Sequence, residues 1–343
     1  MTWAPLLLAD PSPNLRLLVL RELLHAPEDD PEVLELIASR ESDPIIQDLL
    51  RLQNEDGSWR SREGGGCAWQ NIRTTAHALL TLGYLGIGAR HQSVQAGAEY
   101  LFSLQADEGS WPLPKSKADR ELREAYSMIP LQTGIPLRAL AAVGCGTDPR
   151  AEKAFEWLLG VRLPDGAWPS GVQGGKHVFP AGYRRLAHSR YGCRSNTTFA
   201  VSALALHPTR RSSQGARRGL DLLLAQETLQ AHTLGYEVVR TIGAERRRGF
   251  FTYFARHDAA LLLDLCWRIG ASQEDGRVAD MVAFVKSLQG PYGLWEHPGH
   301  PQASRWVSFD LLRSLSRIDE STDWVSQEPR TPFQAYPKEP RRY

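Results

Sequence analysis

Residues 53–59 read QNEDGSW, and this stretch is the first of a series that decides the fold. In each member a tryptophan stands at the seventh position, with a glycine two residues before it. The other members are QADEGSW at 105–111, RLPDGAW at 162–168 and QGPYGLW at 289–295. The last interval is about twice the others, and a degenerate copy, QETLQAH, fills it at 226–232 with His232 in place of tryptophan. Five units of roughly 50 to 65 residues result, and such a period is typical of repeat architectures.

Each unit holds two segments with different helical patterns. The segment before the turn has apolar residues at i, i+3, i+4 and i+7, which predicts a helix with one buried stripe. These amphipathic segments begin near residues 43, 91, 150, 214 and 276. The segment after the turn, such as NTTFAVSALAL at 196–206, is apolar over more of its surface and is predicted to lie inside. Each unit is therefore a hairpin of one outer and one inner helix.

The turn itself has a structural interpretation. Asp-Gly or Glu-Gly ends the outer helix, because glycine adopts a positive φ at low cost. The tryptophan is predicted to pack beneath the helix end, where its N–H finds a partner, and the glutamine to bind carbonyls at the helix terminus. The motif is then a staple between neighbouring hairpins and carries no catalytic role.

The repeats account for most of the chain. Residues 14–40 supply one further helix pair, which makes six hairpins. The ends show no polar capping repeat of the kind an open solenoid needs, so closure into a ring is expected. Residues 1–318 are therefore predicted to form a single all-α domain, and residues 319–343, rich in proline and charge, an extended tail over its surface.

Composition excludes several classes of protein. The formal net charge of the 343 residues is +1, which argues against a nucleic-acid partner. The start, MTWAPLLLADPSP, lacks the basic region of a signal peptide, and the chain has no apolar run long enough to span a bilayer. The four cysteines lie far apart, as expected of free thiols in a reducing compartment. We expect a cytoplasmic protein, and the oligomeric state stays open.

The repeated Gln…Gly-x-Trp turn between alternating helices resembles the repeat of squalene–hopene and oxidosqualene cyclases. It is also similar to that of protein prenyltransferase β subunits, and the resemblance covers roughly residues 10–318. It implies an (α/α)6 toroid, a double barrel of helical hairpins whose inner helices surround an apolar cavity. It further implies a terpenoid-cyclase-like enzyme that binds and transforms a polyisoprenoid, either a prenyl diphosphate or a linear terpene. The fold alone does not fix the reaction.

The catalytic signatures of the two families are incomplete. Class II terpene cyclases protonate their substrate with an Asp of a DxDD box, which this chain lacks; the nearest string, EDDPE at 28–32, is interpreted as charge at a helix N-terminus. Zinc prenyltransferases carry a D-x-C pair and a later His. Asp264 and Cys266 have the spacing, but Val307 stands where the His is expected. His297 and His300 could replace it, yet no metal site is predicted, and zinc or magnesium remains open as a cofactor.

Polar and aromatic residues at the starts of inner helices are the candidate site. Asp258 is the candidate acid, with His257 beside it as a second catalytic residue, because burial in a cavity raises the pKa of a carboxyl group. The alternatives are that Asp258 is an N-cap or a partner of Arg256, and that nearby arginines belong to a solvated loop. The predicted substrate-binding residues are Trp69, Gln70, Tyr126, Tyr191, Arg194, Asn196, Phe250, Phe251, Tyr253, Phe254, Arg256 and Trp306.

Other interpretations of the sequence stay open. Asn196 is also well placed as an N-cap, and His77 is interpreted as a hydrogen-bonded core residue. The function alternatives are a zinc prenyltransferase β-subunit-like transferase and a non-catalytic lipid-binding or interaction scaffold. Two-domain triterpene cyclases are about twice as long as this chain, which leaves room for a partner protein or a peripheral membrane contact at the ring mouth.

Overall fold

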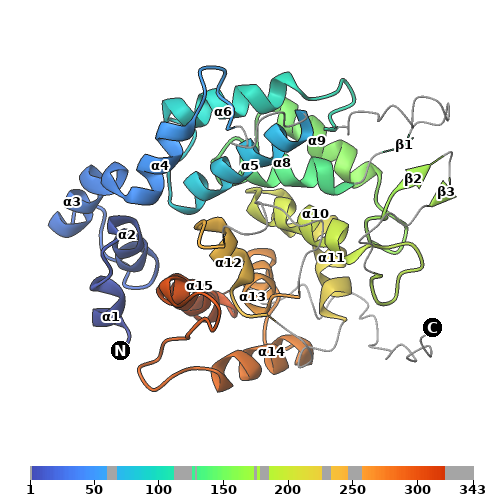
Figure 1. Ribbon diagram of the computed structural model, residues 1–343. Coiled ribbons are helices and arrows are strands. Elements are labelled where there is room, and N and C mark those ends of the chain that lie inside the picture. The colour runs from blue at the N-terminus through green and yellow to red at the C-terminus, as the bar shows by residue number, and fades with distance from the viewer. Residues whose placement is uncertain are drawn as a thin grey trace.

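A computed structural model describes residues 2–59, 68–111, 126–127, 130–173, 176–177, 185–225, 233–245 and 257–320 (Figure 1). Helices dominate, as predicted. The outer helices are α3 (Pro31–Ser39), α4 (Pro44–Leu52), α6 (Gln92–Ser103), α9 (Pro149–Gly160), α11 (Gln214–Leu224) and α14 (Gly276–Ser287). Side-chain oxygens cap several of their first turns: Asp43 accepts from Ile45 N, and Asp148 from Arg150 N. Asp-Pro at the start of α4 and α9 thus sets where each helix begins.

The inner helices are α2 (Pro13–Glu22), α5 (Ala68–Tyr84), α8 (Pro130–Ala142), α10 (Arg194–Leu206), α13 (Ala259–Ile269) and α15 (Ser304–Arg317). Helices α8 and α10 each bury 11 of their 13 residues, whereas α4 buries Ile46 alone. This difference confirms the prediction of outer and inner layers from hydrophobic patterning.

The inner helices pack side by side in a continuous series. Helix α5 contacts α8, α8 contacts α10, α10 contacts α13, and α13 contacts α15. The last inner helix, α15, then contacts the first, α2, so the blue and red ends of the described chain meet in Figure 1. Arg305 forms an ion pair with Asp10 at 3.2 Å, and Arg317 one with Glu22 at 3.4 Å. Both pairs join segments almost 300 residues apart.

Each tryptophan turn holds together the outer and the inner helix of one hairpin. Each indole N–H donates to the carbonyl ten residues earlier in the outer helix, at 2.7 to 2.8 Å, and each tryptophan backbone N–H donates to a hydroxyl of the next inner helix. The carbonyls are those of Leu49, Leu101, Leu158 and Val285, and the hydroxyls those of Thr75, Thr133, Thr197 and Ser308. The predicted partner of the indole N–H beneath the helix end is confirmed for these four turns, but these hydrogen bonds lie within one hairpin and do not join neighbouring hairpins. The degenerate copy at 226–232 lies outside the described residues.

The glutamine of the turn has a different partner from the one expected. Gln53 Nε2 donates to the carbonyl of Gly57 at 3.0 Å and to that of Ser93, in the first turn of α6, at 2.8 Å. Gln105 binds the carbonyl of Arg150 in α9 in the same way, at 3.0 Å. The glutamine therefore links one turn to the next outer helix, rather than binding the end of its own helix.

Several short elements were not predicted. Helix α12 (Tyr236–Thr241) lies between α11 and α13 and contacts α5, α13 and α15; α1 (Ala4–Leu8) precedes α2. Gly235 before α12 has φ +76°, and a Cβ there would stand 2.5 Å from Val307, so only glycine fits. Three two-residue strands, β1 (Tyr126–Ser127), β2 (Val172–Gln173) and β3 (Lys176–His177), form a small antiparallel sheet, and the predicted all-α class is otherwise confirmed. The 3-10 helices are η1 (Arg40–Ser42), η2 (Arg210–Ser212) and η3 (Pro301–Ala303). Among the described helices, none is both long and apolar enough to span a membrane.

A charged cavity among the inner helices

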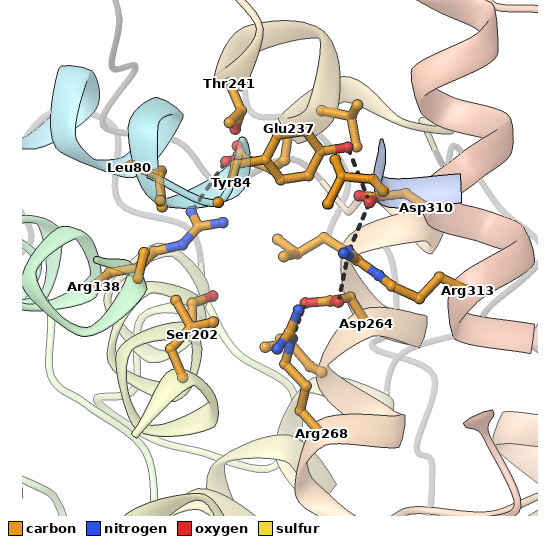
Figure 2. A pocket seen from close by; sticks show the side chains of 18 of the residues that line it. Leu80, Tyr84, Arg138, Ser202, Glu237, Thr241, Asp264, Arg268, Asp310 and Arg313 are labelled. Carbon is orange, nitrogen blue, oxygen red and sulfur yellow. Dashed lines mark hydrogen bonds and ion pairs between the residues drawn. The ribbon is translucent and has the colours of Figure 1, made fainter. Parts of the chain in front are cut away.

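A cavity of about 260 Å³ lies where all six inner helices and α12 come together (Figure 2). It faces the C-terminal halves of most inner helices, not their starts. Its polar lining is Glu22, Tyr84, Arg138, Ser202, Glu237, Thr241, Asp264, Arg268, Asp310 and Arg313. The larger apolar residues are Leu18, Leu80, Leu206, Val238, Leu261 and Leu265. The cavity is therefore not the purely apolar one that was expected, because charged side chains of the inner helices share its lining with the leucines.

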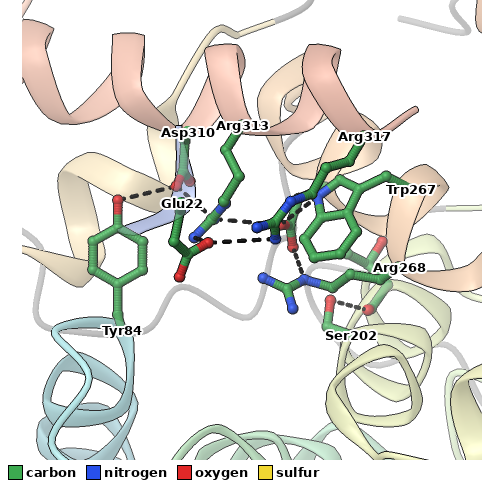
Figure 3. A network of polar contacts seen from close by, with 10 residues as sticks. Glu22, Tyr84, Ser202, Trp267, Arg268, Asp310, Arg313 and Arg317 are labelled. Carbon is green, nitrogen blue, oxygen red and sulfur yellow. Dashed lines mark hydrogen bonds and ion pairs between the residues drawn. The ribbon is translucent and has the colours of Figure 1, made fainter. Parts of the chain in front are cut away.

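Asp310 and Asp264 lie on opposite sides of the guanidinium group of Arg313 (Figure 2), and Figure 3 shows the side chain of Tyr84 reaching Asp310 from another helix. Arg313 donates to Asp310 Oδ1 at 2.7 Å and to Asp264 Oδ1 at 3.4 Å. The hydroxyl of Tyr84, from α5, also donates to Asp310 Oδ1, at 3.1 Å. Arg268 donates to Asp264 Oδ2 at 2.8 Å. Three inner helices, α5, α13 and α15, are thereby joined by one polar network.

The two carboxyl groups of this network differ electrostatically. Burial raises the pKa of Asp310, and the nearby charge of Asp264 adds to this effect, although Arg313 opposes it. Burial acts on Asp264 in the same direction, but the charges of Arg268 and Arg313 outweigh it and lower the pKa of Asp264. Of the two carboxyl groups, Asp310 is therefore the one that takes up a proton more readily.

A second ion-pair group comes from α8 and α12. Glu237 binds Arg240 at 2.8 Å and Arg138 at 3.3 Å, and all three side chains are nearly buried. Burial would raise the pKa of Glu237, but the two guanidinium charges lower it. His77 Nε2 lies 3.0 Å from the carbonyl oxygen of Arg240, and burial together with the charge of Arg240 lowers the pKa of His77 to about 3. His77 is thus the hydrogen-bonded core histidine that the sequence predicts.

Asp258 does not line this cavity. As the N-cap of α13 it accepts from the backbone N–H of Ala260 at 3.2 Å, and it also binds Gly235 N and Glu237 N at the start of α12, both at 2.8 Å. Burial raises the pKa of Asp258 to about 7, although these three donors act in the opposite direction. The capping alternative is confirmed, and the role of Asp258 as an acid stays a prediction.

Other predicted site residues also lie away from the cavity. Asn196 is the third residue of α10 rather than its cap, and its Oδ1 accepts from Leu131 N at 2.7 Å, at the start of α8. Arg194 and Tyr191 are half-buried near the same helix start, and His257 is buried beside Asp258. None of these side chains belongs to the cavity lining.

Trp306 packs against Tyr84, a residue of the cavity lining. The centroid of the Trp306 ring lies 5.9 Å from that of the Tyr84 ring, and the hydroxyl of Tyr84 is the group that binds Asp310. Gln70 is exposed on α5. Trp69 lies in α5 and Tyr126 in β1, but the structure does not describe their side chains. Five further predicted residues lie outside the described part of the chain: Phe250, Phe251, Tyr253, Phe254 and Arg256.

The residues considered for zinc have other partners or surroundings. Asp264 binds arginines, and burial raises the pKa of the Cys266 thiol, which disfavours the thiolate that a metal needs. His297 and His300 stack 5.3 Å apart. Within the described part of the chain, no group of three or more His, Cys, Asp or Glu side chains is placed to hold a metal ion.

The sequence contains a signal for the cavity that attention to helix starts does not find. Arg138 in IPLRALAAVG, Asp264 in LLLDLCWRIG and Asp310 in SFDLLRSL are charged residues inside helices otherwise apolar enough to be buried. Charged side chains are almost never fully buried unless they are paired. Their presence on several inner helices indicates a shared polar centre.

Comparison with known proteins shows what this sequence is similar to. Residues 37–205 match the model of the squalene–hopene cyclase C-terminal domain. The squalene–hopene cyclase of Zymomonas mobilis is 28% identical over 145 residues, 42% of this chain and 21% of that enzyme. The chain is a distant homologue of the squalene–hopene cyclases. The enzyme of Bradyrhizobium diazoefficiens is 25% identical over 176 residues, 51% of this chain and 25% of the enzyme.

These alignments span only about a fifth to a quarter of the squalene–hopene cyclases they match. Among solved structures, the type II terpene cyclase MstE from Scytonema aligns over 81% of this chain and 96% of its own, with 13% identity and a TM-score of 0.30. A protein from Actinoplanes aligns over 80% of this chain and 97% of its own, with 14% identity and a TM-score of 0.29. Scores this low support no conclusion about shape or activity.

Proposed function

We propose that this squalene–hopene cyclase homologue is an (α/α)6 toroid that protonates a short isoprenoid in its central cavity, with Asp310 as the acid. The observation that carries the proposal is the position of Asp310. It lines the cavity, burial and Asp264 raise its pKa, and both of its hydrogen bonds go to Oδ1. Proton-initiated alkene chemistry requires a carboxylic acid that lines the substrate cavity and can be protonated, and we propose that Asp310 is this acid.

The proposed step uses only side chains of the cavity. Asp310 transfers its proton to one carbon of a carbon–carbon double bond, whose electron pair forms the new C–H bond. Positive charge is left on the adjacent carbon and negative charge on Asp310, where Arg313 and Tyr84 stabilise it. Asp264, kept ionised by Arg268, supplies a compensating negative charge nearby. Loss of a proton from a neighbouring carbon to Asp310 closes the cycle.

The size of the cavity favours a short substrate. A volume of 260 Å³ lies just below the range of about 300 to 1,000 Å³ that is typical of pockets for drug-sized ligands. We therefore propose a prenyl diphosphate or linear terpene at the short end of the isoprenoid series, rather than the triterpene implied by the family's name.

The test compares three aspartate variants: Asp310→Asn, Asp258→Asn and Asp221→Asn. Purified protein is incubated with dimethylallyl, geranyl and farnesyl diphosphates, the matching hydrocarbons and squalene, and products are analysed by mass spectrometry. We expect turnover of the short substrates to be lost in Asp310→Asn and kept in Asp221→Asn, whose carboxylate pairs with Arg277 far from this network. Circular dichroism checks that each variant is folded.

The same experiment weighs Asp258, the acid proposed from the sequence. Loss of turnover in folded Asp258→Asn, with Asp310→Asn active, would transfer the role to Asp258. The absence of turnover in the unmodified protein would reject the catalytic proposal altogether.

A second candidate function is a non-catalytic binding scaffold that keeps the helical hairpins. The observation that favours it is that all four acidic side chains of the cavity, Glu22, Glu237, Asp264 and Asp310, already lie in ion pairs. Buried ion pairs of this kind also serve structure alone. Binding of a short isoprenoid without product, measured by calorimetry, would support this candidate over the first.

A further inference from the structure

The tryptophan turns differ in how closely the next outer helix covers them. A Cβ added at the turn glycine would stand 2.7 Å from α9 at Gly109 and 2.9 Å from α11 at Gly166, and α6 covers Gly57 still more closely. At Gly293, in the last turn, the nearest such atoms are 3.5 Å away and belong to the residues just before α1. Among the four described turns, the same interface is therefore closed three times and open once.

The glutamine of the last turn is open in the same way. Gln53 and Gln105 each donate to a carbonyl in the first turn of the next outer helix, besides one in their own turn. Gln289 donates to a carbonyl of its own turn at 2.8 Å, and no described residue of the next element accepts from it. That element is α1, which has 5 residues where the outer helices have 9 to 12. Thr2 Oγ1 donates to the carbonyl of Tyr292 at 3.1 Å, which fixes the start of α1 beside the turn.

Large apolar side chains are exposed around this turn. Leu288 and Tyr292 are 47% and 66% exposed, and Leu6 of α1 is 36% exposed. By contrast, α6, α9, α11 and α14, which the structure describes in full, have no exposed large apolar side chain. Apolar side chains gathered at one place on a surface indicate an interaction site, whereas single ones do not. We call Leu6, Leu288 and Tyr292 the open turn surface.

Helix α3 carries an apolar stripe that its own chain does not cover. Its residues Val33 and Leu36 are buried in a cluster with leucines of α2, whereas Leu34 and Ile37 are 53% and 37% exposed. Residues three apart share one face of a helix, so Leu34 and Ile37 form a second stripe beside the buried one. Helices α1 and α3 both contact α2 and lie at the same side of the molecule in Figure 1.

Charges next to the two surfaces have opposite sign. Glu35 follows Leu34 on α3, and Lys286 lies two residues before Leu288 in the last turn of α14. Both side chains are exposed, and neither has an ion-pair partner within the described ranges. The stripe and the open turn surface are therefore complementary in charge as well as in apolar character.

We propose that two copies of the chain form a twofold-symmetric dimer, in which Leu34 and Ile37 of each copy cover the open turn surface of the other. A second copy fits because one chain presents both halves of the contact, an uncovered turn and an uncovered helix stripe. In a twofold dimer each half meets the other, so both copies are satisfied at once. The contact continues the interface of outer helix on turn that the chain already builds three times. It involves no residue of the cavity, so it stands or falls apart from the proposed function.

A simpler explanation is that these side chains are ordinary parts of a protein surface, about half of which is apolar in any folded chain. That explanation predicts a monomer at every protein concentration. The proposed contact predicts a monomer–dimer equilibrium that depends on concentration.

The test is sedimentation analysis of the full chain over about a hundredfold range of concentration, with circular dichroism as the check of folding. We expect a dimer that Leu34→Glu and Tyr292→Glu each weaken about tenfold or more, because a charge is then buried in an apolar contact. Leu52→Glu is the matched control, since Leu52 is 39% exposed at the end of α4 and belongs to neither surface. It should leave the dissociation constant unchanged.

An exchange of charge tests whether the contact is reciprocal. Glu35→Lys and Lys286→Glu each bring like charges together and should weaken self-association. When the two variant proteins are mixed, opposite charges meet at both contacts, so the mixed dimer should be favoured about fivefold or more over either variant alone.

Three results would overturn the proposal. The first is an unmodified protein that stays monomeric, including one that instead binds phosphatidylcholine vesicles through Leu34 and Tyr292. The second is a dimer that folded Leu34→Glu and Tyr292→Glu leave intact. The third is a mixture of Glu35→Lys and Lys286→Glu that associates no better than either variant alone.

Discussion

Replacing Thr75 by Val tests whether the hydroxyl of an inner helix secures the tryptophan turn. Thr75 Oγ1 accepts the backbone N–H of Trp59 at 3.0 Å, and both residues are buried. Val has nearly the same shape as Thr, so the change removes an acceptor without leaving a cavity. The N–H of Trp59 then stays buried with nothing to bind.

The cost follows from that orphaned donor. A buried polar group deprived of its partner costs about 1 to 3 kcal/mol, and the apolar methyl of Val offsets only part of it. For a chain longer than 250 residues, each kcal/mol lowers the melting temperature by about 2 °C or somewhat less. We expect Thr75→Val to lower the melting temperature by about 2 to 5 °C.

The neighbouring threonine supplies the control. Thr74 lies on the same helix, is less buried, and its hydroxyl donates to the carbonyl of Gln70 within that helix. Thr74→Val should therefore change the free energy of unfolding by less than about 0.5 kcal/mol. Urea denaturation followed by circular dichroism compares the two variants. If Thr75→Val is no less stable than Thr74→Val, the hydroxyl does not secure the turn and the staple does not work as described.

Two further predictions concern a close backbone contact and a buried histidine. Gly57 and Gly144 have similar positive φ values, +82° and +84°, but a Cβ at Gly57 would stand 2.2 Å from the carbonyl oxygen of Ala96, whereas one at Gly144 meets nothing within 4 Å. Gly57→Ala should thus destabilise the protein by at least about 1 kcal/mol more than Gly144→Ala in thermal unfolding, and equal effects would contradict the contact. His77 has a pKa of about 3 when folded and about 6.5 when unfolded, so between these values only the unfolded chain takes up the proton and stability falls as pH falls. Between pH 7 and pH 5 this should cost about 2 kcal/mol, a loss that urea denaturation should find reduced in His77→Gln.

The repeat could be predicted because its determinants are local. Glycine with a positive φ, a tryptophan two residues later and an amphipathic helix before it all lie within about twenty residues, and the structure places Gly57 and Trp59 as expected. The partner of Gln53 could not be predicted in this way, since Ser93 is 40 residues away and belongs to the next hairpin. Local patterns fix the hairpins, and their contacts depend on how the hairpins associate.

The site could be predicted less well for a similar reason. Hydrophobic pattern identifies inner helices, but it does not say which end of each helix faces an open space. We expected the helix starts, where Asp258 and Asn196 lie, and the structure uses both to bind backbone N–H groups of neighbouring segments. Polar residues at helix starts satisfy orphan donors, which makes them poor evidence for catalysis. Asp310 lies in the middle of an inner helix, where no orphan backbone N–H group needs its carboxyl group as an acceptor.

The position of α12 explains how the cavity and Asp258 are connected. Asp258 binds the first N–H groups of α12, which fixes that helix against α13. Because α12 is fixed there, Glu237 reaches Arg138 on α8, and Glu237 and Val238 form part of the cavity wall. The carboxyl group that the sequence indicates as the acid thus determines the shape and charge of the space in which Asp310 lies. An effect of Asp258→Asn on ligand affinity, through displacement of Glu237, follows from this connection even where Asp258 transfers no proton.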